Sequence, residues 1–427
     1  MKLVRLARLV LSCALLFANS ACVIHSEGGF AFAQGKELAE RNETLPLELA
    51  AGETLRVELL YGDISVRVAE GEAPHVDAHW HANAEDKKTA EAVLARYKLE
   101  LLRAPGSLSV RSVGEALEVK SGLGTNRLAA GVDLTLVVPG KVRLEARTSS
   151  GDLSAAGALA FCKLDSSYGD LAARGIRGDT ALATSSGAVE VEDIEASSLE
   201  VESQYGDLRA NHVQAATLRL TPSSGSVSAR DLTGDLIVKS SYGDLSIDGS
   251  RGAVDAATSS GDIAFSSQSS AKRKLVTSYG DISASVGGGE LEARTSSGDV
   301  KIECSDGSVN AESNYGDVSI RGRLSRVQAA TSSGSMSVQA TAGSAASAPW
   351  QIFTNYGDVA LGLPGDFNCE LSASAKSGEI ASDFAGESDK RHTTLKCTLG
   401  TGGNAVDVKS GSGDVSIKRG AGSDRKI

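Results

Sequence analysis

Apolar and polar residues alternate along most of this chain, so that every second side chain faces the same way. Residues 291–295 are typical, because Leu291 and Ala293 are separated by charged residues. Alternation with period two predicts short β-strands with one face buried and the other in water. Glycines punctuate the strands, and a second Gly often follows the first by six residues, as with Gly169 and Gly175. Each unit is therefore predicted to be a turn, a short strand, a second turn and a longer strand.

The turn recurs at a fixed interval. Its Gly appears every 18 or 19 residues from Gly151 to Gly334 and more loosely afterwards, and one early copy stands at residues 60–64. A single unit of this length cannot bury its apolar side alone, so such repeats stack on one another. We expect an all-β fold: a parallel, right-handed β-helix-like β-solenoid with rungs of about 18 residues that lie about 4.8 Å apart.

Successive turns alternate between a Ser form and a Tyr form, such as residues 148–151 and 167–170. If one repeat makes one rung, Tyr and Ser alternate down a single corner, whereas two repeats in a wider rung would stack Tyr on Tyr. We favour the first geometry because the two half-repeats are alike. We interpret the rings as packing residues, with an exposed row that stacks on sugar rings as the functional alternative. The tyrosines are Tyr168, Tyr205, Tyr242, Tyr279, Tyr315 and Tyr356.

An Asp follows the Gly in every Tyr form, and in Ser forms it is often replaced, as by Ala188 or Ser226. Carboxylates stacked at about 5 Å repel one another unless water screens them or a cation bridges them. We favour hydrogen bonds from turn amides to these carboxylates over a calcium ladder. The carboxylates are Asp170, Asp207, Asp244, Asp281, Asp317 and Asp358.

The amino-terminal residues read as an export signal. Lys2, Arg5 and Arg8 precede an apolar run at residues 9–18, which is too short to span a bilayer. Two processing sites remain open: lipoprotein-type cleavage before Cys22, which would be lipidated, or ordinary cleavage after Ala33. The protein is then an outer-membrane or cell-surface lipoprotein, or periplasmic, and only the lipid would attach it to a membrane.

The remaining chain divides into a capping module at 34–140, a regular array at 141–339, and irregular rungs with a tail at 340–427. In the capping module we expect one helix, capped by Asn83, as a cover for the open end of the solenoid. Its apolar face would carry Ala90, Val93, Leu94 and Tyr97.

Four cysteines lie in the part of the chain that is expected to fold. Cys162 and Cys304 alternate with polar neighbours many rungs apart, so we interpret them as buried free thiols. Cys369 and Cys397 could pair in a disulfide.

Composition narrows the function classes. The 427 residues include 47 Gly, 41% hydrophobic residues and a net charge of −11. This balance excludes a collagen or a disordered tail, and it argues against nucleic acid as a partner. The one dense basic cluster, residues 272–274, is expected on a solvated turn.

The sequence offers few candidates for catalytic or metal-binding residues. His75, Asp77, His79 and His81 occupy alternate positions and could ligate Zn²⁺, but we favour a solvated strand face opposite a core of Val76, Ala78 and Trp80. No catalytic motif or phosphate loop is recognisable in the sequence, so we assign no catalytic residue, metal site or cofactor.

Several motifs together resemble the putative-adhesin family of bacterial β-strand-repeat envelope proteins. They are Val-Pro-Gly at 138–140, the turn that ends residues 144–152, the repeated Tyr-Gly-Asp turns, and Ser-Gly-Asp-Val at 412–415. The resemblance covers roughly residues 45 to 418, and the chain departs from a plain repeat at 340–349 and around 369–397. It implies the solenoid architecture and an adhesin-like role, and it supplies no catalytic residues.

The sequence therefore favours a non-enzymatic exported envelope protein, an adhesin or surface scaffold that binds a glycan or an envelope protein. One alternative is a carbohydrate-active β-helix enzyme that uses carboxylates such as Asp262 and Asp281. The other is a structural protein stabilised by cations between its rungs.

Overall fold

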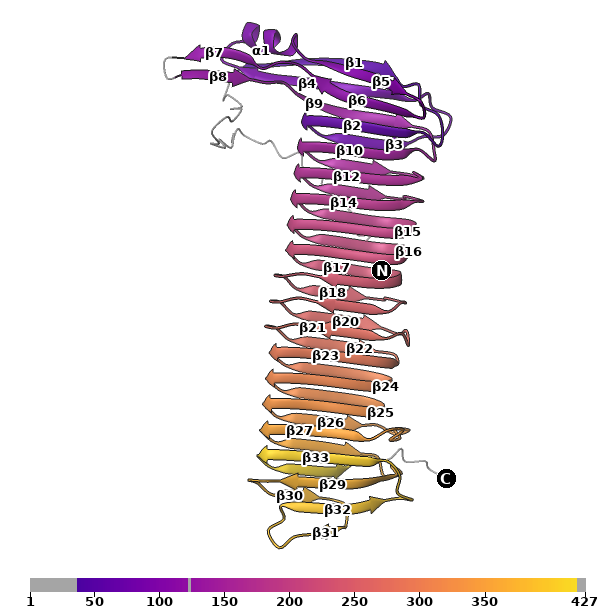
Figure 1. Cartoon of the computed structure of the whole chain (residues 1–427), viewed down its shortest axis with the longest axis vertical. Coiled ribbons are helices and arrows are strands. Elements are labelled where there is room, and N and C mark those ends of the chain that lie inside the picture. The colour runs from indigo at the N-terminus through magenta and orange to yellow at the C-terminus, as the bar shows by residue number, and fades with distance from the viewer. Residues whose placement is uncertain (1–36, 122–123, 421–427) are drawn as a thin grey trace, which may run out of the picture. The chain divides into compact units, whose positions relative to one another are not determined.

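The computed structural model describes residues 37–121 and 124–420. Within these residues the chain is nearly all strand, with one helix (Figure 1). It divides into two compact units. The N-terminal unit holds the described residues up to Glu43 together with His79–Leu99 and Ser112–Val132, and the solenoid unit holds Thr44–Ala78, Glu100–Arg111 and the chain from Asp133 onward.

The solenoid unit is built as the sequence predicted. A longer strand, β10 (Arg143–Ser150), is followed by a Gly turn, a short strand, β11 (Leu153–Ala156), and a second turn. The next longer strand, β12 (Phe161–Tyr168), lies parallel on β10, and β13 (Leu171–Arg174) lies parallel on β11. One repeat therefore makes one rung of a parallel β-solenoid, which confirms the predicted fold and the favoured geometry.

The stacked strands continue in the same manner down the unit (Figure 1). They are β14 (Asp179–Ser186), β15 (Val189–Tyr205), β16 (Leu208–Ser224), β17 (Val227–Lys239), β18 (Leu245–Asp248), β19 (Val254–Ala257), β20 (Ile263–Ser267), β21 (Arg273–Val276), β22 (Ile282–Val286), β23 (Gly289–Ser297), β24 (Val300–Tyr315), β25 (Val318–Ser333), β26 (Met336–Ala340), β27 (Trp350–Tyr356) and β28 (Val359–Leu363).

Aliphatic columns fill the interior between the two strands of each rung. Leu153, Leu171, Val189 and Leu208 occupy one such column on successive rungs, and all four are buried. Each fully buried side chain of this size contributes roughly 1.5–3 kcal/mol through removal of apolar surface from water. Because neighbouring rungs supply this burial to one another, the stack is stable where an isolated repeat would not be.

Arg273 corrects the expectation that residues 272–274 lie on a solvated turn. The side chain is 0% exposed and takes an interior position between Val254 and Leu291. Its guanidinium donates hydrogen bonds to the carbonyls of Ser269 and Gly288, and only the flanking lysines face solvent. Backbone carbonyls satisfy both terminal nitrogens of this buried guanidinium, while its Nε is buried without a hydrogen-bond partner.

The four cysteines within the described residues are free thiols. Cys162 and Cys304 are buried, as predicted. The proposed pairing of Cys369 with Cys397 is wrong in this structure, because the antiparallel register sets Cys369 opposite Leu399 and Cys397 opposite Leu371.

The order of rungs departs from the order of the chain at both ends of the solenoid. β2 (Thr54–Tyr61) and β3 (Ile64–Val68) lie directly against β10 and β11, so the early copy of the turn belongs to the array. On their other side lie β6 (Ser107–Val113) and the solenoid part of β9 (Gly131–Val138). The solenoid unit thus takes in residues that the sequence division placed in the 34–140 module.

The carboxyl-terminal strands return in the same way. β33 (Ala405–Ser412) lies between β27 and β29 (Cys369–Ala375), and β34 (Val415–Arg419) lies between β28 and β30 (Ile380–Ser382). The intervening chain forms β31 (Glu387–Ser388) and β32 (Thr394–Leu399), which runs antiparallel to β29. β33 and β34 therefore fill the penultimate rung of the described stack.

The N-terminal unit contains the helix, α1 (Lys87–Leu94), which is shorter than expected. Its cap is Asp86 rather than Asn83, because the Asp86 carboxylate accepts a hydrogen bond from the Thr89 amide. Ala90, Val93 and Leu94 are buried as predicted, while Tyr97 lies beyond the helix end. The role of this helix as a cover for the solenoid stays a prediction.

The remaining strands near the amino end are β1 (Glu37–Pro46), β4 (His75–Ala84), β5 (Lys98–Ala104), β7 (Leu117–Ser121) and β8 (Gly124–Leu128). β7 and β8 form a separate two-stranded antiparallel sheet. The predicted export signal, including Cys22 and Ala33, lies outside the described residues. Among the described residues, no helix has the length and apolar character needed to cross a membrane.

We expect Gly243→Ala to reduce the free energy of unfolding by about 2–4 kcal/mol, because the new methyl carbon would lie 2.2 Å from the Gly225 carbonyl oxygen and the backbone is held at φ +126°. Gly71→Ala is the matched control, since its φ is +82° but no atom lies within 4 Å, and it should cost about 1 kcal/mol. Urea unfolding followed by circular dichroism measures both, and equal losses would contradict the role of close stacking.

Burial raises the pKa of Cys162 and of Cys369 to about 12, so the reactive thiolate is almost absent at pH 8. We expect N-ethylmaleimide to leave both thiols unmodified in the folded protein and to alkylate them in guanidinium, as followed by peptide mass spectrometry. Cys397, which is partly exposed, serves as the internal comparison. Rapid native labelling of Cys162 would disprove the packing of its rung.

Candidate functional site

The corner of the solenoid is formed by the recurrent turn, and glycine makes it possible. Gly169 has φ +156°, and a methyl group there would lie 1.9 Å from the Gly151 carbonyl oxygen of the preceding rung. The same approach recurs at Gly187 and Gly206. Glycines therefore stack on glycines along the whole corner, and the residue before each Gly is turned toward solvent.

In most turns, a hydroxyl three residues before the Gly bonds to the Gly carbonyl of the preceding rung. The Thr277 hydroxyl donates to the Gly261 carbonyl at 3.0 Å, and the Thr295 hydroxyl donates to the Gly280 carbonyl at 3.0 Å. Similar bonds are made by Thr148, Ser166, Thr184, Thr258, Ser313, Thr331, Thr354 and Ser410. This column of hydroxyls was not predicted from the sequence, although Thr or Ser occupies the position in nearly every copy of the turn.

Where an Asp follows the Gly, its carboxylate links that turn to the following rung. Asp281 accepts a hydrogen bond from the Asp299 amide at 2.8 Å, and Asp299 accepts one from the Asp317 amide at 2.8 Å. The interpretation as acceptors of turn amides is confirmed for the predicted carboxylates: Asp170, Asp207, Asp244, Asp281, Asp317 and Asp358. Since the amide dipole stabilises each charge, the column needs no bridging cation to account for its geometry.

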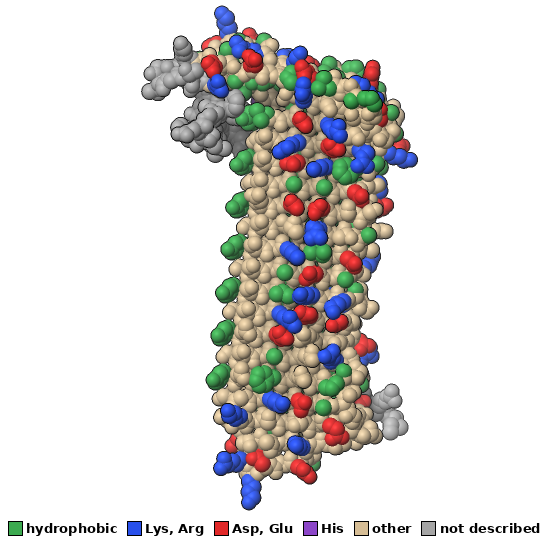
Figure 2. All heavy atoms as spheres, viewed as in Figure 1, with side chains coloured by type: hydrophobic (Ala, Val, Ile, Leu, Met, Phe, Trp, Pro, Cys, Tyr) green, Lys and Arg blue, Asp and Glu red, His purple; other side chains and the backbone are tan. Residues whose placement is uncertain are grey.

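The tyrosine side chains form an exposed row along this corner. Tyr168, Tyr205, Tyr242, Tyr279, Tyr315 and Tyr356 are 60–67% exposed. The expectation that the rings serve as packing residues is therefore wrong, because the Gly turn directs them into solvent. Figure 2 shows hydrophobic side chains in a regular row along one edge of the solenoid unit. We call this surface the Tyr edge.

Serine separates the rings of the Tyr edge. Tyr168 pairs with Ser150 on one side and Ser186 on the other, and the alternation continues without a break to Tyr356 and Ser412. Two rungs separate successive rings, which places them about 9.6 Å apart. A ring that stands above a small hydroxyl leaves both of its faces accessible.

The surroundings of the Tyr edge are mostly polar, and charged side chains also occur on the adjacent face. A depression of about 430 Å³ there is lined by Ser167, Ser185, Gln204 and Ser223, and also by Arg147, Asp165 and Glu202. Arginines lie farther along the strands, where they pair with acids: Arg219 with Glu200, and Arg294 with Glu312. Figure 2 shows these mixed charges on the face and an uncharged band beside the row.

The second corner of the solenoid carries an unusual ionic column. Asp193, His212 and Asp231 occupy it on three successive rungs with φ of 55°, 52° and 51°, where Gly175 and Gly249 occupy the flanking rungs. His212 lies 3.7 Å from Asp193 and 3.6 Å from Asp231. Its nitrogens therefore face carboxylates on both neighbouring rungs, which helps hold three non-glycine residues in a left-handed backbone conformation.

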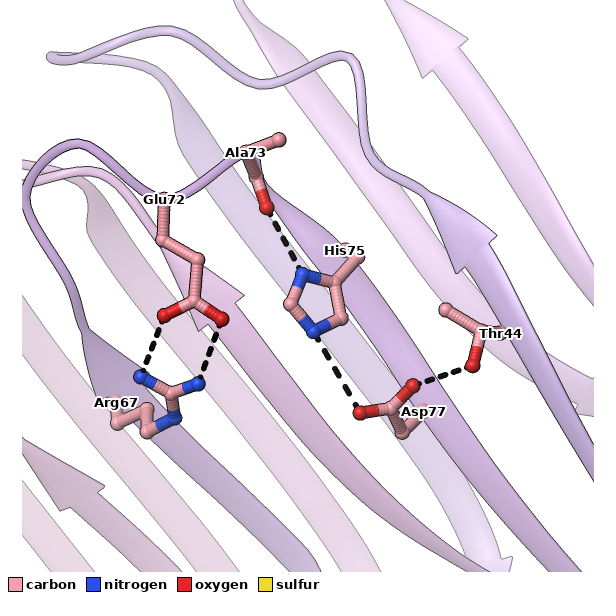
Figure 3. Close-up of polar contacts among 6 residues, drawn as sticks. All are labelled: Thr44, Arg67, Glu72, Ala73, His75 and Asp77. Carbon is pink, nitrogen blue, oxygen red and sulfur yellow. Dashed lines mark hydrogen bonds and ion pairs between the residues drawn. The ribbon is translucent and has the colours of Figure 1, made fainter.

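The candidate zinc ligands lie on the outer face of β4, opposite the buried Val76, Ala78 and Trp80, as the favoured interpretation predicted. In the solenoid unit, His75 Nδ1 lies 2.8 Å from the Ala73 carbonyl and Nε2 lies 3.5 Å from Asp77 (Figure 3).

The polar side chains around these histidines also form hydrogen bonds with other residues. Asp77 accepts a hydrogen bond from Thr44 at 2.6 Å, and Arg67 forms two hydrogen bonds with Glu72 that lower the pKa of Glu72 (Figure 3). In the N-terminal unit, His79 Nδ1 lies 2.6 Å from Asn42, and His81 is half-buried. Within the described ranges, no three such groups converge to hold a metal ion.

We expect Asp281→Ala to lower the free energy of unfolding by roughly 1.5–3 kcal/mol, because the Asp299 amide loses a charged acceptor. Asp281→Asn keeps an acceptor oxygen in place and should cost less. Urea unfolding with and without EDTA tests the origin of the effect. A calcium ladder would instead make both variants equally damaging and would make the wild-type protein sensitive to EDTA.

No curated protein matches the chain. Among solved structures, a putative adhesin from Bacteroides fragilis is 14% identical, with 67% of this chain and 98% of that chain covered and a TM-score of 0.26. A putative cell adhesion protein from Clostridium sporogenes is 9% identical, with 90% and 100% covered and a TM-score of 0.20. The model of the Toastrack DUF4097 family matches residues 63–288, 233–347 and 288–418, and the chain therefore belongs to the Toastrack DUF4097 family.

Proposed function

We propose that this protein is an exported, non-enzymatic surface protein of adhesin type that binds a glycan or an envelope partner through the Tyr edge. The observation that carries the proposal is the row of exposed rings at a constant spacing. An aligned row of exposed aromatic rings is unusual on a protein surface that meets no partner. Sugar rings present flat C–H faces that stack on tyrosine, and the phenol hydroxyl adds a polar contact.

The solenoid suits a binding surface because it holds the rings rigidly. Every turn that carries a Tyr has a stacked Gly, and several, such as the turn at Gly280, are also fixed by an inward hydroxyl and by an Asp carboxylate from the neighbouring rung. A ligand therefore has little backbone to order on binding, and tyrosine itself has few rotatable bonds to immobilise.

The contacts of the carboxylates support this function over the alternative of a carbohydrate-active enzyme. Asp262 accepts the Asp281 amide at 2.8 Å, and Asp281 accepts the Asp299 amide at 2.8 Å. Both residues thus have a structural task that recurs on other rungs, rather than a distinct environment such as paired catalytic carboxylates have.

The export signal expected at residues 1–33 supports a location outside the cytoplasm. Cys22 would anchor the protein by a lipid, whereas cleavage after Ala33 would release it. A surface location would present the Tyr edge to extracellular or envelope polymers, which is the context that the proposal requires.

We expect the triple variant Tyr205→Ala/Tyr242→Ala/Tyr279→Ala to bind immobilised glycans and cell surfaces at least about tenfold more weakly than wild type. Three stacking contacts at roughly 0.5–1.5 kcal/mol each account for such a loss. Phe353→Ala is the control, because Phe353 is an exposed aromatic residue outside the row. Equal binding by the triple variant and the control in surface plasmon resonance would overturn the role of the Tyr edge.

The location is tested by proteolysis of intact cells, with wild type compared with Cys22→Ala. Proteolytic removal of the wild type and release of the variant into the medium would establish a lipid-anchored surface protein. Protection of the wild type until the outer envelope is opened would contradict a surface adhesin and would redirect the search to periplasmic partners.

A further inference from the structure

The spacing of the Tyr edge is maintained in space even where it varies along the chain. Most successive tyrosines lie 37 residues apart, but Tyr315 and Tyr356 are separated by 41 because of the insertion at 340–349. Strand pairing nevertheless sets Tyr315 against Ser333 and Ser333 against Tyr356. The added residues are thus accommodated away from the corner, and the two-rung interval of about 9.6 Å is preserved.

A row of equivalent sites with one period fits a polymer with the same period. Separate small ligands would gain nothing from equal spacing, whereas a polymer in register engages several rings at once and gains avidity. We propose, on the basis of the function proposed above, that the ligand is an extended, neutral β-1,4-linked glycan that lies along the solenoid axis with a sugar ring on each tyrosine.

The stereochemistry of the β-1,4 linkage supplies the period. It turns each sugar by about half a revolution relative to the one before, so that alternate sugars present the same face. The repeating unit is a disaccharide slightly longer than the two-rung interval, which is about 9.6 Å. The intervening sugar then lies over the serine of the intervening rung, such as Ser260 between Tyr242 and Tyr279. Hydroxyls at that position can hydrogen-bond to the sugar without a steric clash.

The charge of the edge selects a neutral polymer. The turns that form it contain no Lys or Arg, and the exposed carboxylates of Asp170, Asp207 and Asp244 lie next to the rings. A polyanionic glycan would meet a row of like charges. A neutral glycan can instead donate its hydroxyl hydrogens to these carboxylates and to side chains such as Gln204 and Asn314.

The linkage also excludes other neutral glycans as good ligands. An α-1,4-linked glucan curves into a helix and a β-1,3-linked glucan coils, so each would leave a straight row after one or two rings. Only an extended ribbon stays in contact from Tyr168 toward Tyr356. Affinity is therefore expected to rise with the length of a β-1,4-linked oligosaccharide and to stay weak at every length of an α-1,4-linked one.

The decisive variant is Tyr242→Ser/Ser260→Tyr, which keeps the composition and breaks the period. Both positions belong to the same column and the same kind of turn, so the exchange places each residue where its equivalent already occurs on other rungs. The new tyrosine would lie three rungs from Tyr205 and one rung from Tyr279. Isothermal titration with cello-oligosaccharides and chito-oligosaccharides of increasing length, and with malto-oligosaccharides as the comparison, gives the affinities.

We expect the exchange to weaken binding of the longest β-1,4-linked oligosaccharides about tenfold and to leave the circular dichroism spectrum unchanged. Unchanged affinity, equal affinity for malto-oligosaccharides, or tighter binding of a polyanion such as alginate would each overturn the inference. In those cases the loss of binding in the triple alanine variant would still support the Tyr edge as a binding surface. If that variant also bound normally, the proposed function itself would fail.

Discussion

The structure depends on the contact of one glycine with the next along the corner of the solenoid. Each turn Gly approaches the carbonyl of the preceding Gly so closely that no side chain could be accommodated, and it adopts a backbone conformation that other residues avoid. This contact fixes the register of the rungs. The aliphatic columns, the buried hydroxyls and the carboxylates all rely on that register, because each of them meets its partner on a neighbouring rung.

The same constraint determines the surface. A chain that turns sharply at Gly must direct the preceding side chain outward, whether it is Ser or Tyr. The fold therefore displays whatever residue occupies that position, at a spacing set by the backbone. Stability and display are separate properties in this arrangement, since Gly, Thr and Asp hold the turn while the residue before Gly makes little contact with the protein. The position can change without loss of the fold, which suits a binding surface.

Much of the fold could be predicted because its periods are explicit. The alternation of apolar and polar residues predicted the strands, and the spacing of the recurrent Gly predicted the length of a rung. The orientation of the tyrosines was predicted wrongly, because an aromatic residue in a β-rich chain is usually buried, and only the φ of the following Gly reveals otherwise. Arg273 was misplaced for a related reason: charge suggested solvent, whereas its position in the alternation indicated the interior. The return of β2 and β33 into the stack depends on long-range pairing, which no local pattern encodes.

The place of β33 and β34 also bears on how the molecule is assembled. These strands leave the ribosome after β27–β30, yet they lie inside the stack, between those strands made earlier. A solenoid whose rungs followed the chain could be completed one rung at a time as it emerges. Here the rung formed by β29 and β30 cannot dock on the stack until residues 405–419 have arrived to lie beneath it. Completion of this end therefore requires synthesis at least as far as β34, because a product truncated before Ala405 would leave two unpaired strand edges facing each other.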